Sequence, residues 1–288
     1  MIYSMTGFGK GQSTFNDKII QVEIKSLNSK HCDINLKLNN RYRAEELNVR
    51  NHVNGQLVRG KIEVIVRLEE GENSLPVTIN RDLAAKYLTE LKNAEAALNL
   101  ASEDLFRMVL NMPDVIKREK EEMEDGESDA LFSALDLAIV EMMSFRRAEG
   151  EKLAAELRSR IESILNLLEE VKAVEKERIA GIKERIQNSL SKLEDNTVDQ
   201  NRYEQELIYY LEKLDVTEEK VRLKAHCDYF LETMEIDFSG KKLGFIGQEI
   251  GREVNTLGSK SNHAGMQRIV VQMKDELEKI KEQVLNVL

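Results

Sequence analysis

The sequence predicts an α+β protein that is predominantly α-helical, with a small N-terminal antiparallel sheet layer, a long central helical hairpin or projecting helix, and a C-terminal helical domain. Three observations support this prediction. Before residue 70, three segments alternate apolar and polar residues, as half-buried antiparallel strands do. From residue 81 onward, apolar residues recur every three or four positions, as on one face of a helix. In addition, 33% of the residues are charged and only 2 are Pro, which is typical of helix-rich proteins with charged surfaces.

The predicted strands span residues 19–27, 32–38 and 61–69. In the first of them Ile20, Val22 and Ile24 would face a core, while the residues between them face solvent. The segment 41–60 between the second and third strands has a helical pattern. The glycine-rich stretch GFGKG at 7–11 lacks the spacing of the common nucleotide-binding loops, so it predicts no nucleotide fold.

The central part is predicted to be helical. Helices are expected at 81–99 and 102–111, and they stop near Pro113. The run from residue 131 to residue 193 contains no Pro and only two Gly, so it predicts about 60 helical residues, or about 90 Å. A helix of that length projects, folds back as a hairpin or spans subunits. A break is expected at 195–199.

The C-terminal third has the periodicity of further helices, expected at 201–213, 216–236, 243–257 and 263–287. The last of these has a narrow apolar seam with alternating spacings of four and three residues, made of Met266, Val270, Met273, Leu277, Ile280, Val284 and Val287. This seam predicts helix packing either within the chain or between subunits. We expect an N-terminal α+β domain at 1–155, a helical connector at 156–200 and a C-terminal helical domain at 201–288.

Charge is distributed unevenly along the chain. The net charge is −10, but the first 67 residues hold 11 Lys and Arg against 6 Asp and Glu. This local excess of +5 is compatible with an anionic partner despite the acidic total. The acidic segment 117–129 is expected to be a solvated loop. Because no secretory signal or membrane-length apolar run is present and Cys is scarce, we expect a cytoplasmic protein with no membrane partner.

The stretch GQEIGREVNTLGSKSN at 247–262 is the first candidate site. Glu249 and Glu253 lie one helical turn apart, and such like charges destabilise a helix by a few tenths of a kcal/mol. One interpretation is a surface charge ladder with Arg252, in which Gly247 and Gly251 form a notch for a neighbouring helix. The other is that a divalent cation with oxygen ligands lies between the carboxylates, while the glycines allow a backbone or phosphate to approach.

The end of the same stretch predicts a turn between two helices. Gly258 suits the left-handed position that closes a helix, and Ser261 or Asn262 can cap the next one. Lys260 would then lie beside a free helix N-terminus, where anions bind readily.

A second candidate set lies in the segment 214–230. Asp215 and Glu218 have the spacing of a capping box, and Glu218, Arg222 and His226 follow at intervals of four along one helical face. Glu218 and Arg222 predict an ordinary salt bridge. His226 is either a packed histidine or a proton-transfer group.

Seven motifs, taken together and in order, resemble the YicC/YloC family of bacterial endoribonucleases over nearly the whole chain. They are MIYSMTGFGKG (1–11), EIKSLNSKH (23–31), RGKIEV (59–64), RRAEG (146–150), NRYEQE (201–206), DVTEEKVRLKAH (215–226) and QEIGREVNTLGSKS (248–261). The resemblance implies a cytosolic, stress-associated protein that cuts RNA with a divalent cation and forms a ring-like homo-hexamer with a central channel.

The family pattern also falls on the candidate site residues. We hypothesise that Glu249 and Glu253 hold Mg²⁺ or Mn²⁺ and act in catalysis, with His226 as the proton-transfer group. We expect RNA binding by Arg59, Lys61, Arg202, Arg222, Arg252, Asn255 and Lys260. In one place the chain departs from the family pattern, because Gly244 stands where the family typically has an acidic residue. If that acid helps to place the metal, activity is reduced in this protein.

The sequence therefore predicts a metal-dependent endoribonuclease with weak sequence preference, because few aromatic residues are present to stack bases. Three alternatives stay open. The RNA 2′-OH could attack with His226 as base and without a metal. The protein could be a non-catalytic adaptor that binds RNA and recruits another ribonuclease. The long helices could also form a purely structural scaffold.

Overall fold

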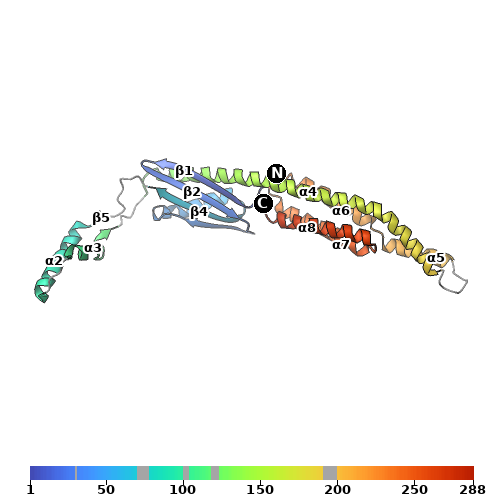
Figure 1. The fold of residues 1–288 in the computed structure, drawn as a ribbon. Helices are drawn as coiled ribbons and strands as arrows, with labels where there is room; N and C mark the ends of the chain where they lie inside the picture. Colours follow the sequence, from blue (N-terminus) through green and yellow to red (C-terminus); the bar gives the residue numbers. More distant parts are fainter. Residues whose placement is uncertain (30, 70–77, 100–103, 118–122, 191–199) are drawn as a thin grey trace.

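The computed structural model of the chain describes residues 1–29, 31–69, 78–99, 104–117, 123–190 and 200–288. The described part is elongated and slightly curved (Figure 1). A small sheet lies against one half of the long helix α4 (Glu127–Leu190), and a helical bundle lies along its other half. The prediction of a predominantly helical α+β fold with a small N-terminal sheet and a long helix is confirmed.

The sheet has the strand order β1-β2-β4-β3, formed by β1 (Gly7–Phe15), β2 (Lys18–Leu27), β3 (Cys32–Lys37) and β4 (Gly60–Glu69). The pairs β1–β2 and β2–β4 are antiparallel, whereas β3 and β4 are parallel. The expectation of antiparallel pairing was therefore wrong for β3. The reason is the connection: the 3₁₀ helix Asn40–Glu45 and α1 (Glu46–Gln56) carry the chain back across the sheet, which allows β4 to start beside the start of β3.

The first strand, β1, was not predicted from the sequence, and its glycines explain why. Gly9 and Gly11 lie so close to α4 that a Cβ atom would be 2.0 Å from the carbonyl oxygen of Ala138 and 1.9 Å from that of Ala134. Because β1 places backbone instead of side chains against the helix, it lacks the alternating apolar pattern of an ordinary strand. The motif GFGKG is thus a packing device, in agreement with the absence of a nucleotide-binding spacing.

The predicted long helix is confirmed as α4, which has 64 residues and contributes to two separate cores. Its first half buries Leu131, Leu135 and Met142 against the sheet, whose inward side chains include Ile20, Val22, Ile24, Ile62 and Val64. Its second half buries Leu157, Ile161 and Ile164 in the bundle. The expected break at 195–199 lies outside the described residues, and the expected domain bounds stay a prediction.

The bundle consists of the second half of α4 together with α6 (Thr217–Thr233), α7 (Gly240–Lys260) and α8 (Ala264–Val284). Helix α7 packs between α6 and α8, and α4 packs against α8 and α6. All seven residues of the predicted apolar seam of α8 are buried within this single chain. Of the two interpretations of the seam, packing within the chain is the one observed.

Two smaller helical parts flank this body (Figure 1). Helices α2 (Arg81–Leu98) and α3 (Leu105–Leu110) form a unit with the short strands β5 (Thr78–Ile79) and β6 (Ile116–Lys117) at one end. Helix α5 (Gln200–Lys213) lies near the far end of α4. No helix in the described ranges combines the length and the apolar character that a membrane span needs.

The predicted solvated loop at 117–129 includes residues 118–122, which lie outside the described part, and the prediction was wrong for its end, where α4 begins at Glu127. Glu127 is fully buried, and Arg41 donates two hydrogen bonds of 2.6 Å to its carboxylate from Nε and Nη2. Tyr42 donates a third hydrogen bond at 2.8 Å. These donors outweigh the cost of burial and lower the pKa of Glu127 from 4.5 to about 2. The start of α4 is therefore fixed to the sheet domain by a buried ion pair.

The sheet domain and the bundle meet where the chain termini lie. The Met5 amide donates to the carbonyl of Asn286 at 2.8 Å, and the Leu288 amide donates to the carbonyl of Tyr3 at 2.9 Å. At the same place the guanidinium of Arg146 is buried and donates to the Ser26 hydroxyl at 2.6 Å. Burial lowers the pKa of Arg146 to about 10. The relative placement of the two cores is thus set by backbone hydrogen bonds and by one buried cation.

Candidate nucleic-acid site

The candidate site is built on the hairpin of α6 and α7, whose two helices run antiparallel. Lys242 is near the start of α7, and Tyr229 is near the end of α6. The Lys242 ammonium lies 4.7 Å from the centroid of the Tyr229 ring. At the other end, the Lys260 ammonium lies 2.8 Å from a carboxylate oxygen of Glu219. His226 lies between these two contacts on α6, so it comes opposite the segment of α7 that carries the candidate carboxylates.

These side chains share the border between the two helices. Glu253 precedes Lys260 by seven residues, and His226 follows Glu219 by seven, so each pair lies on one helical face. Because Lys260 and Glu219 touch across the border, the other two also flank it. Glu249, one turn before Glu253, extends the same stripe. The structure thus brings together predicted residues that lie far apart in the sequence.

The two candidate carboxylates differ in their surroundings. Glu249 is 41% exposed and accepts a hydrogen bond of 2.7 Å from Arg252 on the next turn. Glu253 is half-buried and makes no hydrogen bond or ion pair with any residue that the structure describes. The salt bridge between Glu249 and Arg252 agrees with the first interpretation of this stretch, the surface charge ladder. Glu253 keeps its oxygen lone pairs available to a ligand.

The glycines of α7 have a structural role. A Cβ atom on Gly251 would lie 3.2 Å from the Cδ2 atom of Leu277, and one on Gly258 would lie 2.9 Å from Cγ1 of Val270. Both glycines therefore admit α8, and they are not openings for a phosphate. The notch interpretation, which named Gly247 and Gly251, thus holds for Gly251. Gly247 has no atom within 4 Å of the position that a Cβ would take.

The predicted turn after Gly258 was wrong. Helix α7 continues to Lys260, and Gly258 has no left-handed conformation, because its contact with α8 is made as part of a regular helix. Helix α8 starts after His263, without a side-chain cap from Ser261. Instead, the side-chain amide of Gln267 donates 2.7 Å hydrogen bonds to the carbonyls of Gly258 and Ser261, which closes the C-terminus of α7. Lys260 consequently lies in the last turn of α7 and not on the predicted turn, and its ammonium contacts Glu219.

On α6, the predicted salt bridge between Glu218 and Arg222 is present, and both side chains are exposed. Asp215 accepts hydrogen bonds from the amide and the hydroxyl of Thr217 at 3.0 and 2.7 Å, which lowers the pKa of Asp215. Asp215 thus caps the start of α6, whereas Glu218 pairs with Arg222 and does not complete a capping box. His226 is half-buried at the border with α7.

The remaining RNA-binding candidates lie in three places. Arg59 and Lys61 are at the start of β4, where Arg59 donates from Nε to the carbonyl of Ser29 at 2.9 Å and Lys61 is exposed. Asn255 is exposed on α7. Arg202 belongs to α5, and its side chain lies outside the described part. Arg59 and Lys61 are at the junction end of the sheet, whereas Lys260 lies about 30 Å along α7 from its first residue.

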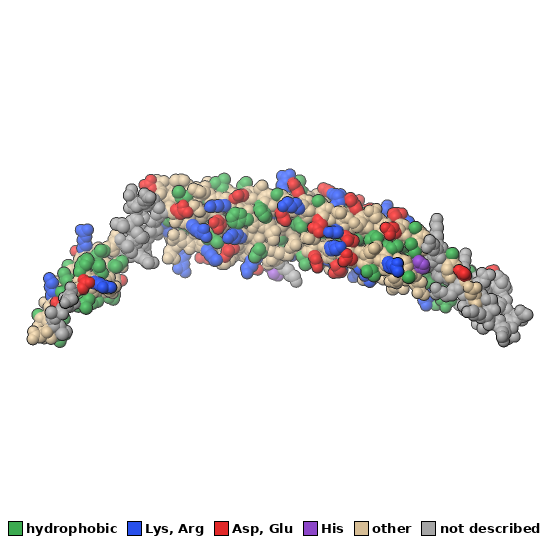
Figure 2. All heavy atoms as spheres, viewed as in Figure 1, with side chains coloured by type: hydrophobic (Ala, Val, Ile, Leu, Met, Phe, Trp, Pro, Cys, Tyr) green, Lys and Arg blue, Asp and Glu red, His purple; other side chains and the backbone are tan. Residues whose placement is uncertain are grey.

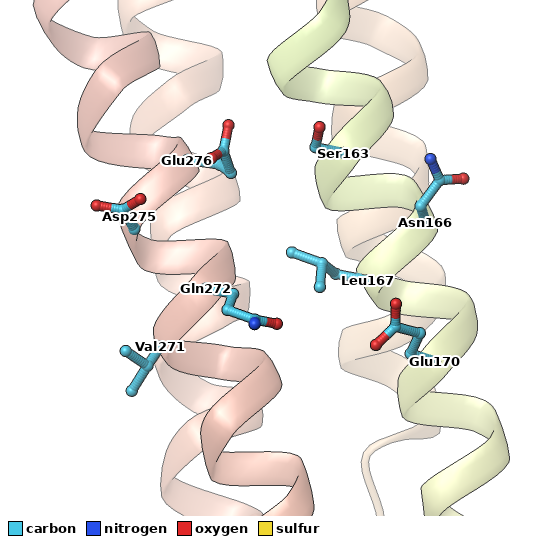
Figure 3. Close-up of a pocket in the computed structure, with 8 residues that line it drawn as sticks. All are labelled: Ser163, Asn166, Leu167, Glu170, Val271, Gln272, Asp275 and Glu276. Carbon is cyan, nitrogen blue, oxygen red and sulfur yellow. The ribbon is translucent and has the colours of Figure 1, made fainter.

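The surface charge differs between the faces of the molecule. Lys and Arg side chains gather over the sheet in Figure 2, and the exposed cations of its strands include Lys10, Lys25, Lys61 and Arg67. By contrast, the groove between α4 and α8, with a volume of about 680 Å³, is lined by Glu170, Asp275 and Glu276, which Figure 3 shows together with their neighbours. This groove is across the bundle from the α6–α7 border, and its carboxylates would repel a nucleic acid.

A metal at this site would have few protein ligands. Among the described residues, no group of three or more His, Cys, Asp and Glu side chains is placed to hold a metal ion. Glu249 and Glu253 lie one turn apart, and Glu253 has no partner among the residues that the structure describes. Such a pair fits a hydrated Mg²⁺ or Mn²⁺ that takes its other ligands from water and substrate phosphate. They do not form a closed protein cage.

Sequence reasoning missed two features of the site. The first is Glu219, which is 6% exposed and has one carboxylate oxygen, Oε2, that is buried without a hydrogen-bond partner among the described residues. The second is Arg146, which donates to the carbonyl of Arg59 at 3.2 Å and so supports the start of β4. A charged residue in an otherwise apolar face is the sequence signal that marks both of them.

The whole chain is similar to proteins of one family. The model of the endoribonuclease YicC-like N-terminal region matches residues 2–155, and that of the endoribonuclease YicC-like C-terminal region matches residues 171–288. "Probable endoribonuclease YicC" of Clostridioides difficile is 34% identical over 292 residues, and the alignment covers 100% of this chain and 100% of that protein. The protein of the same name from Haemophilus influenzae is 30% identical over 290 residues and 99% of each chain. The chain therefore belongs to the YicC-like endoribonuclease family.

Proposed function

We propose that this protein is an endoribonuclease that cleaves RNA phosphodiester bonds at the border between α6 and α7. The observation that carries the proposal is the contact between Lys260 and Glu219 across this border, on whose two helices lies a group of two carboxylates, a histidine and three cations. Its members are Glu249, Glu253, His226, Arg222, Arg252 and Lys260. The names of the two full-length relatives support RNA cleavage as the reaction.

Each group of side chains has a distinct task in this proposal. His226, half-buried beside the carboxylates, moves the proton at the attacking or the leaving oxygen. The exposed guanidinium groups of Arg222 and Arg252 and the ammonium of Lys260 bind phosphate oxygens on either side of the cleaved bond. Glu249 and Glu253 hold a divalent cation, Mg²⁺ or Mn²⁺. When bound, that ion supplies a water of lowered pKa and positive charge against the phosphate.

Binding of the RNA strand extends beyond the reacting atoms. Arg59 and Lys61 lie at the start of β4, and the exposed lysines of the sheet lie beside them, so these residues would guide the strand by salt-dependent phosphate contacts. We further propose a homo-oligomer, a hexamer with a central channel, in which the RNA-binding surfaces of several copies face one strand.

A second candidate function is an RNA-binding adaptor that recruits another ribonuclease and does not cut. Two observations favour it. Gly244 takes the place of an acidic residue of the family pattern, and the described residues contain no metal-binding group of three or more ligands. In this case the cations of the α6–α7 border would bind RNA while Glu249 and Glu253 stay without a metal.

Cleavage of an end-labelled oligoribonucleotide by highly purified protein distinguishes these functions. Wild type should cut, and both a chelator and the double variant Glu249→Gln plus Glu253→Gln should reduce the rate by at least tenfold. The matched control is Glu278→Gln plus Glu282→Gln, which removes two exposed carboxylates one turn apart on α8. It should cut like wild type.

The product ends identify the attacking group. Attack by water leaves a terminal phosphomonoester, whereas attack by the 2′-OH leaves a 2′,3′-cyclic phosphate. Equal rates in all samples, including the chelator, would remove the metal and its two carboxylates from the proposal. Binding of the oligonucleotide without any cleavage would establish the adaptor instead.

A further inference from the structure

Glu219 is the most deeply buried carboxylate of the α6–α7 hairpin, and its position differs from that of the other acidic residues there. Its side chain is 8% exposed, whereas that of its neighbour Glu218 is 65% exposed. Its Oε1 atom lies 2.8 Å from the Lys260 ammonium, and its Oε2 atom is buried with no hydrogen-bond partner in the part of the chain that the structure describes. This arrangement lowers the stability of the folded protein, since an unsatisfied buried acceptor costs about 1–3 kcal/mol of folding free energy.

Stability alone does not account for such an arrangement. A buried ion pair loses most of its Coulomb energy to desolvation, and an apolar pair of similar size is often equally stable or more so. The benefit of the contact is therefore geometric. Glu219 lies in the first turn of α6 and Lys260 in the last turn of α7, where the helix dipoles favour an anion and a cation respectively.

We propose that Glu219 is a positioning residue that fixes the Lys260 ammonium at the phosphate-binding border. This inference rests on the proposed function, because it specifies how one of its cations is oriented. The carboxylate contacts the ammonium from the buried side, while 33% of the lysine side chain stays exposed. A flexible four-carbon side chain at a helix end is thereby held in one place before RNA arrives, which reduces the entropy lost on binding.

A double-mutant cycle tests this role. The variants are Glu219→Gln, which keeps the shape and removes the charge, Lys260→Met, and the double variant. Because Glu219 acts only through the lysine, Lys260→Met and the double variant should lose the same activity. Glu219→Gln should lose about three- to tenfold in kcat/KM, and the salt dependence of RNA binding should weaken in the single variants, most in Lys260→Met.

A second ion pair at the same end of the bundle provides the matched control. Glu175 and Lys220 are similarly buried, with side chains 16% and 13% exposed, and the lysine has no part in the proposed site. Glu175→Gln should lose a similar amount of stability in urea unfolding as Glu219→Gln while RNA binding and cleavage stay within twofold of wild type. If Glu219→Gln fails to fold, Glu219→Leu replaces it, because an apolar side chain removes the desolvation cost.

The outcomes are distinct. If Lys260→Met loses activity while Glu219→Gln behaves like the control, Glu219 has no positioning role and the proposed function stands. Additive losses in the double variant would also overturn the inference. If Lys260→Met binds and cuts like wild type, both the inference and the role of Lys260 are wrong. If wild type does not cut, the cleavage proposal fails, and the binding curves of the same four proteins still decide the role of Glu219.

Discussion

The buried pair of Arg41 and Glu127 should make the stability of the sheet domain depend on pH in a specific range. The carboxylate of Glu127 has a pKa of about 2 in the folded protein and 4.5 when it is free of its partners. A group whose pKa is lowered by folding stabilises the protein fully above the unfolded pKa. That stabilisation disappears as the pH falls through the folded pKa, so the range here is pH 4.5 to 2.

The magnitude follows from the two pKa values. Each tenfold change in proton affinity corresponds to about 1.4 kcal/mol, so ionised Glu127 contributes roughly 3 kcal/mol at pH 7. The same relation gives a loss of about 2 kcal/mol by pH 3. Glu127→Gln removes this contribution and also takes from the guanidinium of Arg41, only 4% exposed, its two 2.6 Å hydrogen bonds to a buried carboxylate, while the 3.2 Å contact with the more exposed Glu124 stays. We therefore expect a loss of 3–5 kcal/mol at pH 7, the range typical of broken buried pairs.

The assay is urea unfolding followed by far-UV circular dichroism at pH 7, 5, 4 and 3. The quantity of interest is the difference between wild type and Glu127→Gln, because carboxylates remote from Arg41 titrate equally in both proteins, and Glu124, which shares Arg41, is half-exposed. This difference should be largest at pH 7 and should shrink by about 2 kcal/mol at pH 3. The control Glu278→Gln removes a carboxylate that is 67% exposed, and it should stay within about 0.5 kcal/mol of wild type at every pH. A difference for Glu127→Gln that is constant from pH 7 to pH 3 would refute the reasoning.

Two further predictions concern glycines. Gly9→Ala should destabilise the protein by about 3 kcal/mol or more, because its Cβ would lie 2.0 Å from the backbone oxygen of Ala138. Gly55→Ala, with open space around it in α1, should stabilise the protein by up to about 1 kcal/mol. Equal midpoints of urea unfolding for the two variants would contradict this prediction. Gly244→Asp should fold normally, since a Cβ there meets only Val284 at 3.8 Å, and it should raise the rate of RNA cleavage by restoring the acid of the family pattern. An unchanged rate in a correctly folded variant would show that the missing acid does not limit activity.

Much of the fold was predictable because its signals are local. The alternation of Ile20, Val22 and Ile24 indicated a strand, and all three residues are buried on one face of β2. The seam from Met266 to Val287 indicated a packed helix, and the Pro-free run indicated α4. In each case the side chains that define the element lie within a few residues of one another in the sequence. Their spacing therefore indicates which face of the strand or helix becomes buried.

The failures have a common physical cause. Strand β1 was missed because its inward positions are glycines, whose function is visible only when the α4 backbone lies against them. The burial of Glu127 in an acidic segment depends on Arg41, which is 86 residues earlier in the chain. The parallel pairing of β3 with β4 depends on the path of a crossover. No local pattern contains these partners.

The candidate site divides in the same way. The sequence alone indicated the carboxylates of Glu249 and Glu253, the stripe that ends at His226, and the family to which these motifs belong. Only the tertiary structure decided that Gly251 serves helix packing, that Lys260 ends a helix beside a buried Glu219, and that α6 and α7 border one another along these residues. Spacing along a chain determines which side chains share a helical face, whereas the packing of apolar faces determines which helices meet.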